Sequence, residues 1–467
     1  MTATTELFPY PATDHREPRR GRFHFSPQAG WMNDPNGLVY YRGTYHLYFQ
    51  HNPRSLEWDT MHWGHATSPD LVHWTQRPIA LHPDVHPGAL FSGGGVVDVT
   101  NTSGLATAQH DPIVVFTGTQ GVRAMVSLDG GDTFEPLDDG RVLATPPGRE
   151  SRDPKVFRHE PSGRWVMVVW SDDDGNGVNF FGSPDLREWT FLSRFAADWM
   201  FECPDVSVMA LDGDPGELRH VLVSASGGYL VGDFDGLEFV PAGDRPQHVT
   251  RHPGGAGSDY YAAQTFSNVP DGRVVSVAWQ GRNRGPTWTG NLSFPVEQRL
   301  LSSADGVHVH SEPVAEIALL HREVRTEQDV AVTAAGLRIG ADPSARDTDG
   351  LDVEVAVDRA RSSARRLILE AVVPGGCAET ITAYDLEEHA LDGHSLPAAG
   401  QAADAAVVRV LVDRDQVAVF AAGGRHYLAV NRALEDPERT AELRLRADGG
   451  DAVLSTLTVR RLGASWS

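Results

Sequence analysis

Apolar runs recur at regular intervals along the segment from about Phe23 to Leu301. They read TYHLYFQ, DPIVVFTGT, RWVMVVWSD, RHVLVSAS and GRVVSVAWQG, and begin near Thr44, Asp111, Arg164, Arg219 and Gly272. Each run is rich in β-branched and aromatic residues and is bounded by turn residues, which is typical of β-strands. The runs lie roughly 50 to 70 residues apart, which fits one four-stranded antiparallel sheet per repeat. This pattern predicts an all-β segment built from repeated sheets.

A second motif follows four of these runs. It reads SPDLVHW (68–74), SLDGGDTF (127–134), SPDLREW (183–189) and GDFDGLEF (232–239). In each copy a small residue leads through an acidic turn to an aromatic residue, as a repeated hairpin corner would. Together the two repeats predict a five-bladed β-propeller. An irregular all-β domain with chance similarity between its segments is the alternative.

The composition and the hydrophobic pattern of the chain change after Leu301. Aromatic residues become rare, and LDVEVAVDRA, ARRLILEAVV and AAVVRVLVDRDQVAVF alternate apolar with polar positions. Such alternation with short turns indicates an antiparallel β-sandwich. The sequence therefore predicts an all-β chain, a five-bladed β-propeller followed by a C-terminal β-sandwich. The expected parts are an N-terminal arm (1–22), the propeller (23–311), a linker or short helix (312–324) and the sandwich (325–467).

The charge narrows the set of partners. The formal net charge is −23, which argues against nucleic acid and against an anionic membrane surface, and it is compatible with a neutral sugar. The chain has 11 Trp, which suggests aromatic surfaces that stack on sugars, although a Trp-rich core would account for them as well. The N-terminal stretch has no apolar leader, and no apolar run approaches membrane-spanning length, which predicts a cytoplasmic protein.

Metal and thiol chemistry find little support. The chain has two cysteines, Cys203 and Cys377, far apart in sequence, and 20 His without metal-ligand spacing. We therefore expect no disulfide framework, no metal site and no cofactor. Cys203 directly follows an acidic residue, and no activating histidine stands in its motif. We interpret it as a small buried neighbour that tunes the acid, and not as a nucleophile.

Acidic residues stand where the inner strand of a propeller sheet should begin. Asp34 opens NDPNGLVYY, Asp153 opens RDPKVF, Glu202 opens ECPDVSVM and Asp259 opens DYYAAQTF. Inner strands line the central channel, so these residues should ring one of its mouths. A proline follows three of the acids at once or one residue later; it fixes φ and suits a strand start. The alternative is that these are turn acids that satisfy nearby backbone amides.

Carboxyl groups that converge on one funnel suit glycoside cleavage, which needs one ionised nucleophile and one protonated acid. Local polarity suggests the roles. Glu202 is flanked by apolar residues, which should raise its pKa and make it the acid. Asp34 sits among turn amides beside Asn33, which should keep it ionised for attack. Asp153 stands beside Arg152, which should keep it charged and suited to hydrogen-bond substrate hydroxyls.

These motifs resemble the signature blocks of a known family. WMNDPNG, FSGG, RDPKVF and ECPD, together with MHWGHATSPDLVHW, VGDFDG and DYYAAQTF, are similar in kind and order to those of glycoside hydrolase family 32. This is the group of β-fructofuranosidases, inulinases and levanases. The resemblance covers about residues 23 to 301, and it implies a five-bladed propeller with a C-terminal β-sandwich.

The resemblance also implies a retaining mechanism. Asp34 would form a fructosyl-enzyme ester, and Glu202 would protonate the leaving oxygen and then activate water. Asp153 would bind fructose hydroxyls and stabilise the transition state. The implied substrate contacts are Asn33, Gln50, Trp58, Phe91, Ser92 and Arg152. Among them, Trp58 and Phe91 would form an apolar wall for the furanose ring.

The leading hypothesis is an exo-acting β-fructosidase that removes terminal non-reducing fructose from sucrose, fructo-oligosaccharides, inulin or levan. Two alternatives use the same site. A sucrose-6-phosphate hydrolase would need a basic pocket, which Arg282 and Arg284 could supply. A transfructosylase would pass fructose to a sugar acceptor. Two further alternatives are a sialidase-like propeller, which would need an Arg cluster, and a carbohydrate-binding propeller without catalysis, which should have lost one of the three acids.

Overall fold

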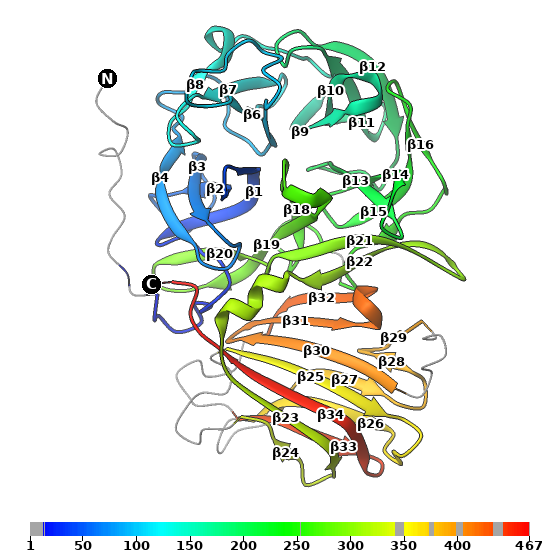
Figure 1. Ribbon diagram of the computed structural model, residues 1–467. Helices are drawn as coiled ribbons and strands as arrows, with labels where there is room; N and C mark the ends of the chain where they lie inside the picture. The colour runs from blue at the N-terminus through cyan, green and yellow to red at the C-terminus, as the bar shows by residue number, and fades with distance from the viewer. Residues whose placement is uncertain are drawn as a thin grey trace.

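The computed structural model describes residue 13 and residues 15–252, 254–340, 350–372, 378–397, 405–432 and 442–466 (Figure 1). The all-β prediction is confirmed, because the described residues form strands joined by turns and by short 3-10 helices. These helices are η2 (Leu137–Gly140), η3 (Glu160–Ser162), η4 (Pro270–Gly272), η5 (Ala315–Leu320) and η6 (Ala422–Gly424). Most of the predicted N-terminal arm, residues 1–12 and 14, lies outside the described residues, as does Cys377.

The N-terminal part consists of successive groups of antiparallel strands. The first group is β1 (Gly30–Tyr41), β2 (Thr44–Asn52), β3 (His62–Ser68) and β4 (Thr75–Leu81). The second is β5 (Gly95–Val97), β6 (Ile113–Thr117), β7 (Arg123–Ser127) and β8 (Glu135–Pro136). The third is β9 (Glu150–His159), β10 (Arg164–Asp172), β11 (Asn176–Ser183) and β12 (Thr190–Ala196). The fourth is β13 (Asp205–Leu211), β14 (Asp214–Val223), β15 (Gly228–Phe234) and β16 (Phe239–Pro241), with β17 (Gln247–His248) paired to β15.

The last group of this part connects back to the first. It comprises β18 (Tyr261–Thr265), β19 (Val274–Arg284), β20 (Trp288–Leu292), β21 (Val296–Ser303) and β22 (Gly306–Pro313). Strand β20 pairs with β19 and also, in parallel, with the start of β1. Figure 1 shows the groups arranged around a common centre. The five apolar runs of the sequence form β2, β6, β10, β14 and β19, so each is the second strand of its group.

The acidic corner motif forms the same kind of turn each time it occurs, after the third strand of a group. In the third group, Asp185 accepts hydrogen bonds from the backbone N–H groups of Arg187 and Glu188. Asp70, Asp129 and Asp235 bond backbone N–H groups in the corresponding turns. The carboxylate takes up amide groups that the turn leaves without a ladder partner, which explains why an acid recurs there.

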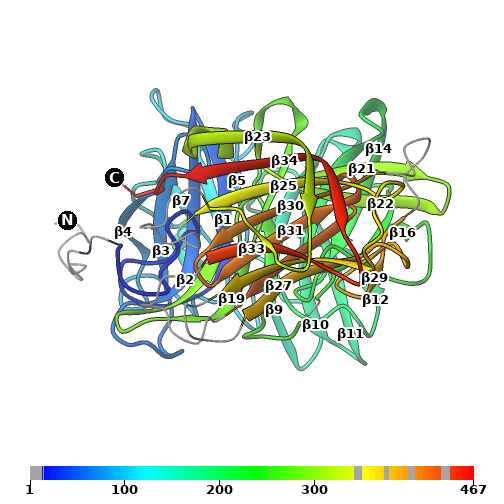
Figure 2. The ribbon, with the colours of Figure 1, turned by 90° about the horizontal axis from the view of Figure 1, so that it is seen from below.

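The C-terminal part contains two six-stranded sheets. One has the order β23-β34-β25-β30-β31-β32, and the other has the order β24-β33-β26-β27-β28-β29. The strands are β23 (His321–Val332), β24 (Leu337–Arg338), β25 (Leu351–Asp358), β26 (Arg366–Val372), β27 (Ala378–Asp385), β28 (Ala390–Leu391), β29 (His394–Ser395), β30 (Ala405–Asp413), β31 (Gln416–Ala421), β32 (His426–Asn431), β33 (Glu442–Asp448) and β34 (Ala452–Leu462). One apolar core joins residues of both sheets, such as Val353 and Val408 from the first and Leu369 and Leu445 from the second. Figure 2 shows this part from below, in front of the N-terminal groups.

The two parts pack against each other. A second apolar core combines Phe294 and Leu300 of the N-terminal part with Phe420 and Tyr427 of the C-terminal part. The buried carboxylate of Asp413 accepts hydrogen bonds from three successive backbone N–H groups, those of residues 22, 23 and 24. Between the parts, the predicted linker contains the end of β22, the helix η5 and the start of β23. The domain boundaries themselves stay a prediction.

Candidate active site

Two inner strands carry a β-bulge at a residue that the sequence singles out. In β1, Asn33 and Asp34 together lie opposite Gln50 of β2, because the pairing shifts between Met32 and Pro35. In β9, the pairing with β10 shifts in the same way around Asp153. Asp34 and Asp153 therefore lie inside their strands, and the expectation that proline marks the strand start is wrong for these two motifs. In the third motif, Pro204 directly precedes β13 (Asp205–Leu211). A bulge turns a side chain out of the normal alternation and tolerates proline, which has no N–H for the ladder.

Unusual backbone conformations accompany these positions. Asp153 has a φ of 62°, and Glu202 and Cys203, which lie just before β13, have φ values of 54° and 39°. A positive φ is costly for a residue other than glycine, and such residues cluster at functional sites where the surrounding structure enforces them. The fold thus holds Asp153 and Glu202 in strained backbone conformations, which set the directions of their side chains.

The side chains of Asp34, Asp153 and Glu202 line one cavity of about 510 Å³. The nine residues predicted to be catalytic or substrate-binding all border it: Asn33, Asp34, Gln50, Trp58, Phe91, Ser92, Arg152, Asp153 and Glu202. Trp31, Cys203, Ala256, Gly257, Tyr261 and Trp279 complete the lining. The volume lies within the range of about 300 to 1,000 Å³ that is usual for small-molecule sites. The structure thus brings these residues together, while their catalytic and binding roles stay predictions.

Asp34 is buried in the floor of this cavity, with 8% of its surface exposed. Ser92 Oγ donates a hydrogen bond to Asp34 Oδ2 over 2.6 Å, and Cys203 Sγ lies 3.6 Å from the same oxygen. Burial raises the pKa of Asp34 to about 6; the charge of Glu202 adds to this, and the Ser92 hydrogen bond opposes it. The donors to Asp34 are the side chains of Ser92, Cys203 and Asn33 and not the expected turn amides, and a pKa of about 6 still leaves the carboxyl mostly ionised at pH 7.

Asp153 is equally buried, with 5% of its surface exposed. Its Oδ2 accepts a hydrogen bond from the backbone N–H of Cys203 over 3.0 Å and lies 3.5 Å from the sulfur of that residue. Burial raises the pKa of Asp153 to about 7, and the charges of Glu202 and Asp34 act in the same direction. The expectation that Arg152 keeps Asp153 charged is wrong, because the guanidinium comes no closer than 3.9 Å and is directed elsewhere.

Glu202 receives that guanidinium. Arg152 donates from Nη2 and Nε to Glu202 Oε1 over 2.7 and 3.2 Å, and the Tyr261 hydroxyl donates to Oε2 over 2.6 Å. The side chain of Glu202 is 21% exposed, more than those of the two aspartates. The predicted apolar setting of Glu202 is therefore wrong. Its apolar neighbour Phe201 contacts Trp170 and leaves the carboxylate to polar partners.

Cys203 lies between the two buried aspartates. Burial, followed by the nearby negative charges, raises the pKa of its thiol well above the ordinary value. Such a thiol stays protonated and is a poor nucleophile. Cys203 is partly buried, and the acids that its sulfur contacts are Asp34 and Asp153, not Glu202 as expected.

Tyr261 is the polar residue that the sequence reasoning missed. The acid expected at this place was Asp259, which does not line the cavity and instead lies 3.6 Å from Arg282. Tyr261, two residues later, is the first residue of β18 and reaches Glu202. The useful signal was the strand alternation in DYYAAQTF, since residues two apart point to the same side of a strand.

The rim of the cavity is aromatic, and nearby arginines are paired. Trp31 and Trp279 contact each other with ring centroids 5.9 Å apart, and Trp58 is 59% exposed. Arg284 forms an ion pair with Glu57 over 3.0 Å. Neither Arg282 nor Arg284 lines the cavity, so the basic pocket that a sugar phosphate would need is not formed by these residues.

The described ranges lack two kinds of feature. They contain no group of three or more His, Cys, Asp or Glu side chains placed to hold a metal ion. They also contain no helix both long and apolar enough to span a membrane.

Comparison with known proteins identifies relatives of the whole chain. Residues 24–313 match the sequence model of the glycosyl hydrolases family 32 N-terminal domain. A levanase of Bacillus subtilis (strain 168) is 32% identical over 496 residues, which cover 96% of this chain and 71% of that protein. An extracellular exo-inulinase of Meyerozyma guilliermondii is 33% identical over 79% of this chain and 76% of its own length.

Solved structures agree with these relatives. The exo-inulinase from Aspergillus awamori superposes with a TM-score of 0.82 at 25% identity, covering 97% of this chain and 100% of that one. The β-fructofuranosidase from Schwanniomyces occidentalis, complexed with fructosyl-erythritol, gives a TM-score of 0.83 at 25% identity, with coverages of 97% and 99%. On the match to the family model and the similarity to the levanase, the chain belongs to glycoside hydrolase family 32.

Proposed function

We propose that this protein is an exo-acting β-fructosidase that hydrolyses terminal non-reducing β-D-fructofuranosides with retention of configuration. The observation that carries the proposal is the convergence of Asp34, Asp153 and Glu202 in one cavity from three separate strand groups. Relatives named levanase, exo-inulinase and invertase support a fructose-containing substrate. A solved relative complexed with fructosyl-erythritol supports it as well.

In the proposed mechanism, Asp34 attacks the anomeric carbon of the terminal fructosyl unit. The bond to the leaving oxygen breaks as Glu202 gives that oxygen its proton, and a fructosyl ester of Asp34 forms. Glu202 then takes a proton from water, and the water oxygen attacks the same carbon and frees Asp34. Two inversions at one carbon give net retention.

The remaining residues prepare these steps. Arg152 and Tyr261 hold the Glu202 carboxyl in place from both sides. Asp153, a buried carboxyl group of the same cavity, would bind the ring hydroxyls and stabilise positive charge that develops on the sugar. The three carboxyl groups are coupled, because a charge on one disfavours a charge on its neighbours. The ionisation that Asp34 needs for its attack therefore depends on whether Glu202 carries its proton.

We also propose the finer architecture. The five strand groups would form the blades of a propeller, which the parallel pair of β1 and β20 closes. The two six-stranded sheets with their common core would form a β-sandwich. The proposed boundaries remain 23–311 for the propeller, 312–324 for the linker and 325–467 for the sandwich.

The alternatives fit less well. The arginines proposed for a phosphate pocket are paired with acids outside the cavity, which disfavours a sucrose-6-phosphate hydrolase. A binding protein without catalysis would have no use for three coupled carboxyl groups in one pocket, two of them buried with raised pKa values. Transfer of fructose to a sugar acceptor uses the same first step, and on sucrose it would release glucose without an equal amount of fructose.

The test is a screen of fructose release from sucrose, sucrose-6-phosphate, kestose-type oligomers, inulin and levan. We expect release from the unphosphorylated substrates, and we expect Glu202→Gln to lower kcat by about 10²- to 10⁴-fold. Asp259→Asn is the matched control, since this acid has a similar place in the sequence but lies outside the cavity. Release from no substrate would contradict the proposal, and full turnover by Glu202→Gln would remove Glu202 from the acid role.

A further inference from the structure

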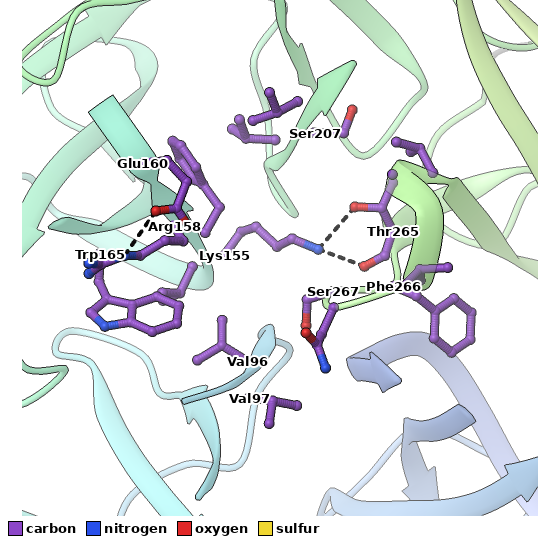
Figure 3. Close-up of a pocket in the computed structure, with 18 of the residues that line it drawn as sticks. Val96, Val97, Lys155, Arg158, Glu160, Trp165, Ser207, Thr265, Phe266 and Ser267 are labelled. Carbon is purple, nitrogen blue, oxygen red and sulfur yellow. Dashed lines mark hydrogen bonds and ion pairs between the residues drawn. The ribbon is translucent and has the colours of Figure 1, made fainter. Parts of the chain in front are cut away.

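A buried polar cluster lies one layer beyond the candidate active site. It consists of Lys155, Asp205 and Thr265, and we call it the Lys155 cluster. Lys155 Nζ lies 2.7 Å from Asp205 Oδ1, and both side chains are only 3% exposed. Lys155 Nζ also donates to the backbone oxygen of Thr265 over 2.7 Å and to its Oγ1 over 3.2 Å (Figure 3). The Thr265 hydroxyl in turn donates to Asp205 Oδ2 over 2.8 Å.

Each member of the cluster lies on, or directly after, a segment that carries a residue of the site. Lys155 follows Asp153 on β9. Asp205 is the first residue of β13 and comes shortly after Glu202. Thr265 is the last residue of β18, whose first residue is Tyr261. Along the chain, Lys155 is thus near Asp153, Asp205 is near Glu202, and Thr265 is near Tyr261.

The Lys155 cluster does not touch the candidate active site directly. None of its three members lines the 510 Å³ cavity. Lys155 and Thr265 instead border a separate cavity of about 300 Å³, which Val96, Ser207 and Phe266 also line (Figure 3). An effect of the cluster on the reaction would therefore act through the position of other residues.

Besides this cluster, the polar contacts between these strand regions include those of the site itself, such as the hydrogen bonds of Arg152 and Tyr261 to Glu202. Strand β9 pairs with β10, β13 pairs with β14 and with β21, and β18 pairs with β19. Among the described residues, no backbone ladder joins any two of β9, β13 and β18 directly. An ion pair with short, directed hydrogen bonds adds a directional constraint that non-directional apolar packing does not supply.

We propose that Lys155, Asp205 and Thr265 are positioning residues that fix the mutual distances of Asp153, Glu202 and Tyr261. A buried ion pair is a poor source of stability, since apolar residues of similar volume are often as stable. Its contribution here is geometry. Asp153 and Glu202 hold strained backbone conformations, which persist only on a firm support. This inference rests on the proposed function, because it concerns the geometry of that reaction.

The central test compares Lys155→Met, Asp205→Leu and the double variant that carries both. Each single variant leaves a buried charge unpaired and should lower Tm sharply, whereas the double variant removes both charges and should regain most of the lost Tm. We expect the double variant to keep a kcat about 10- to 100-fold below that of the unchanged protein, since small misplacements of catalytic groups cost that much. KM should change by less than about threefold.

A gentler pair of variants covers the case in which the charge variants fail to fold. Thr265→Val removes the bridging hydroxyl and should lower kcat, while Thr265→Ser keeps the hydroxyl and should retain it. Arg409→Met is the matched structural control, because it breaks the buried ion pair with Asp352 far from the site. This control should lower Tm without changing kcat.

The outcomes separate the two proposals. A folded double variant with unchanged kcat, or equal kcat in Thr265→Val and Thr265→Ser, would show that the cluster is merely structural. An unchanged protein that releases fructose from no substrate would instead contradict the proposed function. Loss of kcat in the double variant with recovered Tm supports the positioning role.

Discussion

If Asp34 and Asp153 have the proposed roles, they should determine the acidic side of the pH dependence, because both are buried carboxyl groups with raised pKa values, about 6 and about 7. In the proposed mechanism, Asp34 must be ionised to attack the substrate. We therefore expect kcat/KM to fall as the pH decreases through about 7 to 6, and not near the ordinary value of 3.8. The measurement is kcat/KM for fructose release between about pH 4 and pH 9.

The variant Ser92→Ala tests whether Asp34 causes this acidic limb. The Ser92 hydroxyl donates to Asp34 and lowers its pKa against the effect of burial. Removing that donor should move the acidic limb of kcat/KM to higher pH, because the charged form of Asp34 loses a hydrogen bond. Identical acidic limbs in Ser92→Ala and the unchanged protein would contradict the assignment of this limb to Asp34.

Asp153 should trade stability for function. The native protein holds the Asp153 proton more tightly than the unfolded chain does, since its pKa is raised from 3.8 to about 7. This contribution to stability is fully present below about pH 4 and is lost as the pH rises through about 7. We expect Asp153→Asn to raise Tm at pH 8 by a few degrees and to leave Tm at pH 4 nearly unchanged, while fructose release is lost. Equal Tm values at pH 8 would contradict this.

At the scale of elements, the sequence predicts which strands form better than it predicts where their side chains point. The apolar runs and the acidic corners identify the repeated strands because both depend on local patterning. The bulges at Asp34 and Asp153 depend on the register of a partner strand, which no local pattern records. Arg152 bonds Glu202 of another strand group and comes no closer than 3.9 Å to its neighbour Asp153, which depends on how two strand groups meet and not on the local sequence. The site residues were therefore predictable, and their electrostatic environments were not.

We expect the repeated corner turn to contribute to the stability of the protein and not to catalysis. The Asp185 carboxylate accepts hydrogen bonds from two backbone N–H groups of its turn. We expect Asp185→Ala to lower the free energy of unfolding by about 1 to 2 kcal/mol. Asp185→Asn keeps an acceptor oxygen and should lose less. The measurement is the urea midpoint at constant m-value, with kcat for fructose release as a control that should not change in either variant.

On the scale of the whole molecule, one buried carboxylate connects the start of the chain to the C-terminal sheets. Asp413 is fully buried and accepts the backbone N–H groups of Arg22, Phe23 and His24, and the ring of His24 lies 2.9 Å away. Burial opposes the charged form, but the His24 ring and the N–H groups prevail and lower the pKa of Asp413. Its contribution to stability is therefore present above the ordinary carboxyl pKa and is lost in acid.

Asp413→Ala tests how strongly the two parts depend on each other. It leaves three buried N–H groups without an acceptor, so we expect a loss of about 3 kcal/mol or more in the free energy of unfolding and a lower Tm. Asp305→Ala is the matched control, since it removes the exposed ion pair with Arg425 between the same two parts. Exposed pairs contribute little, so its Tm should hardly change. If the two variants had equal Tm values, the parts would be held together by their shared apolar core and not by this buried carboxylate.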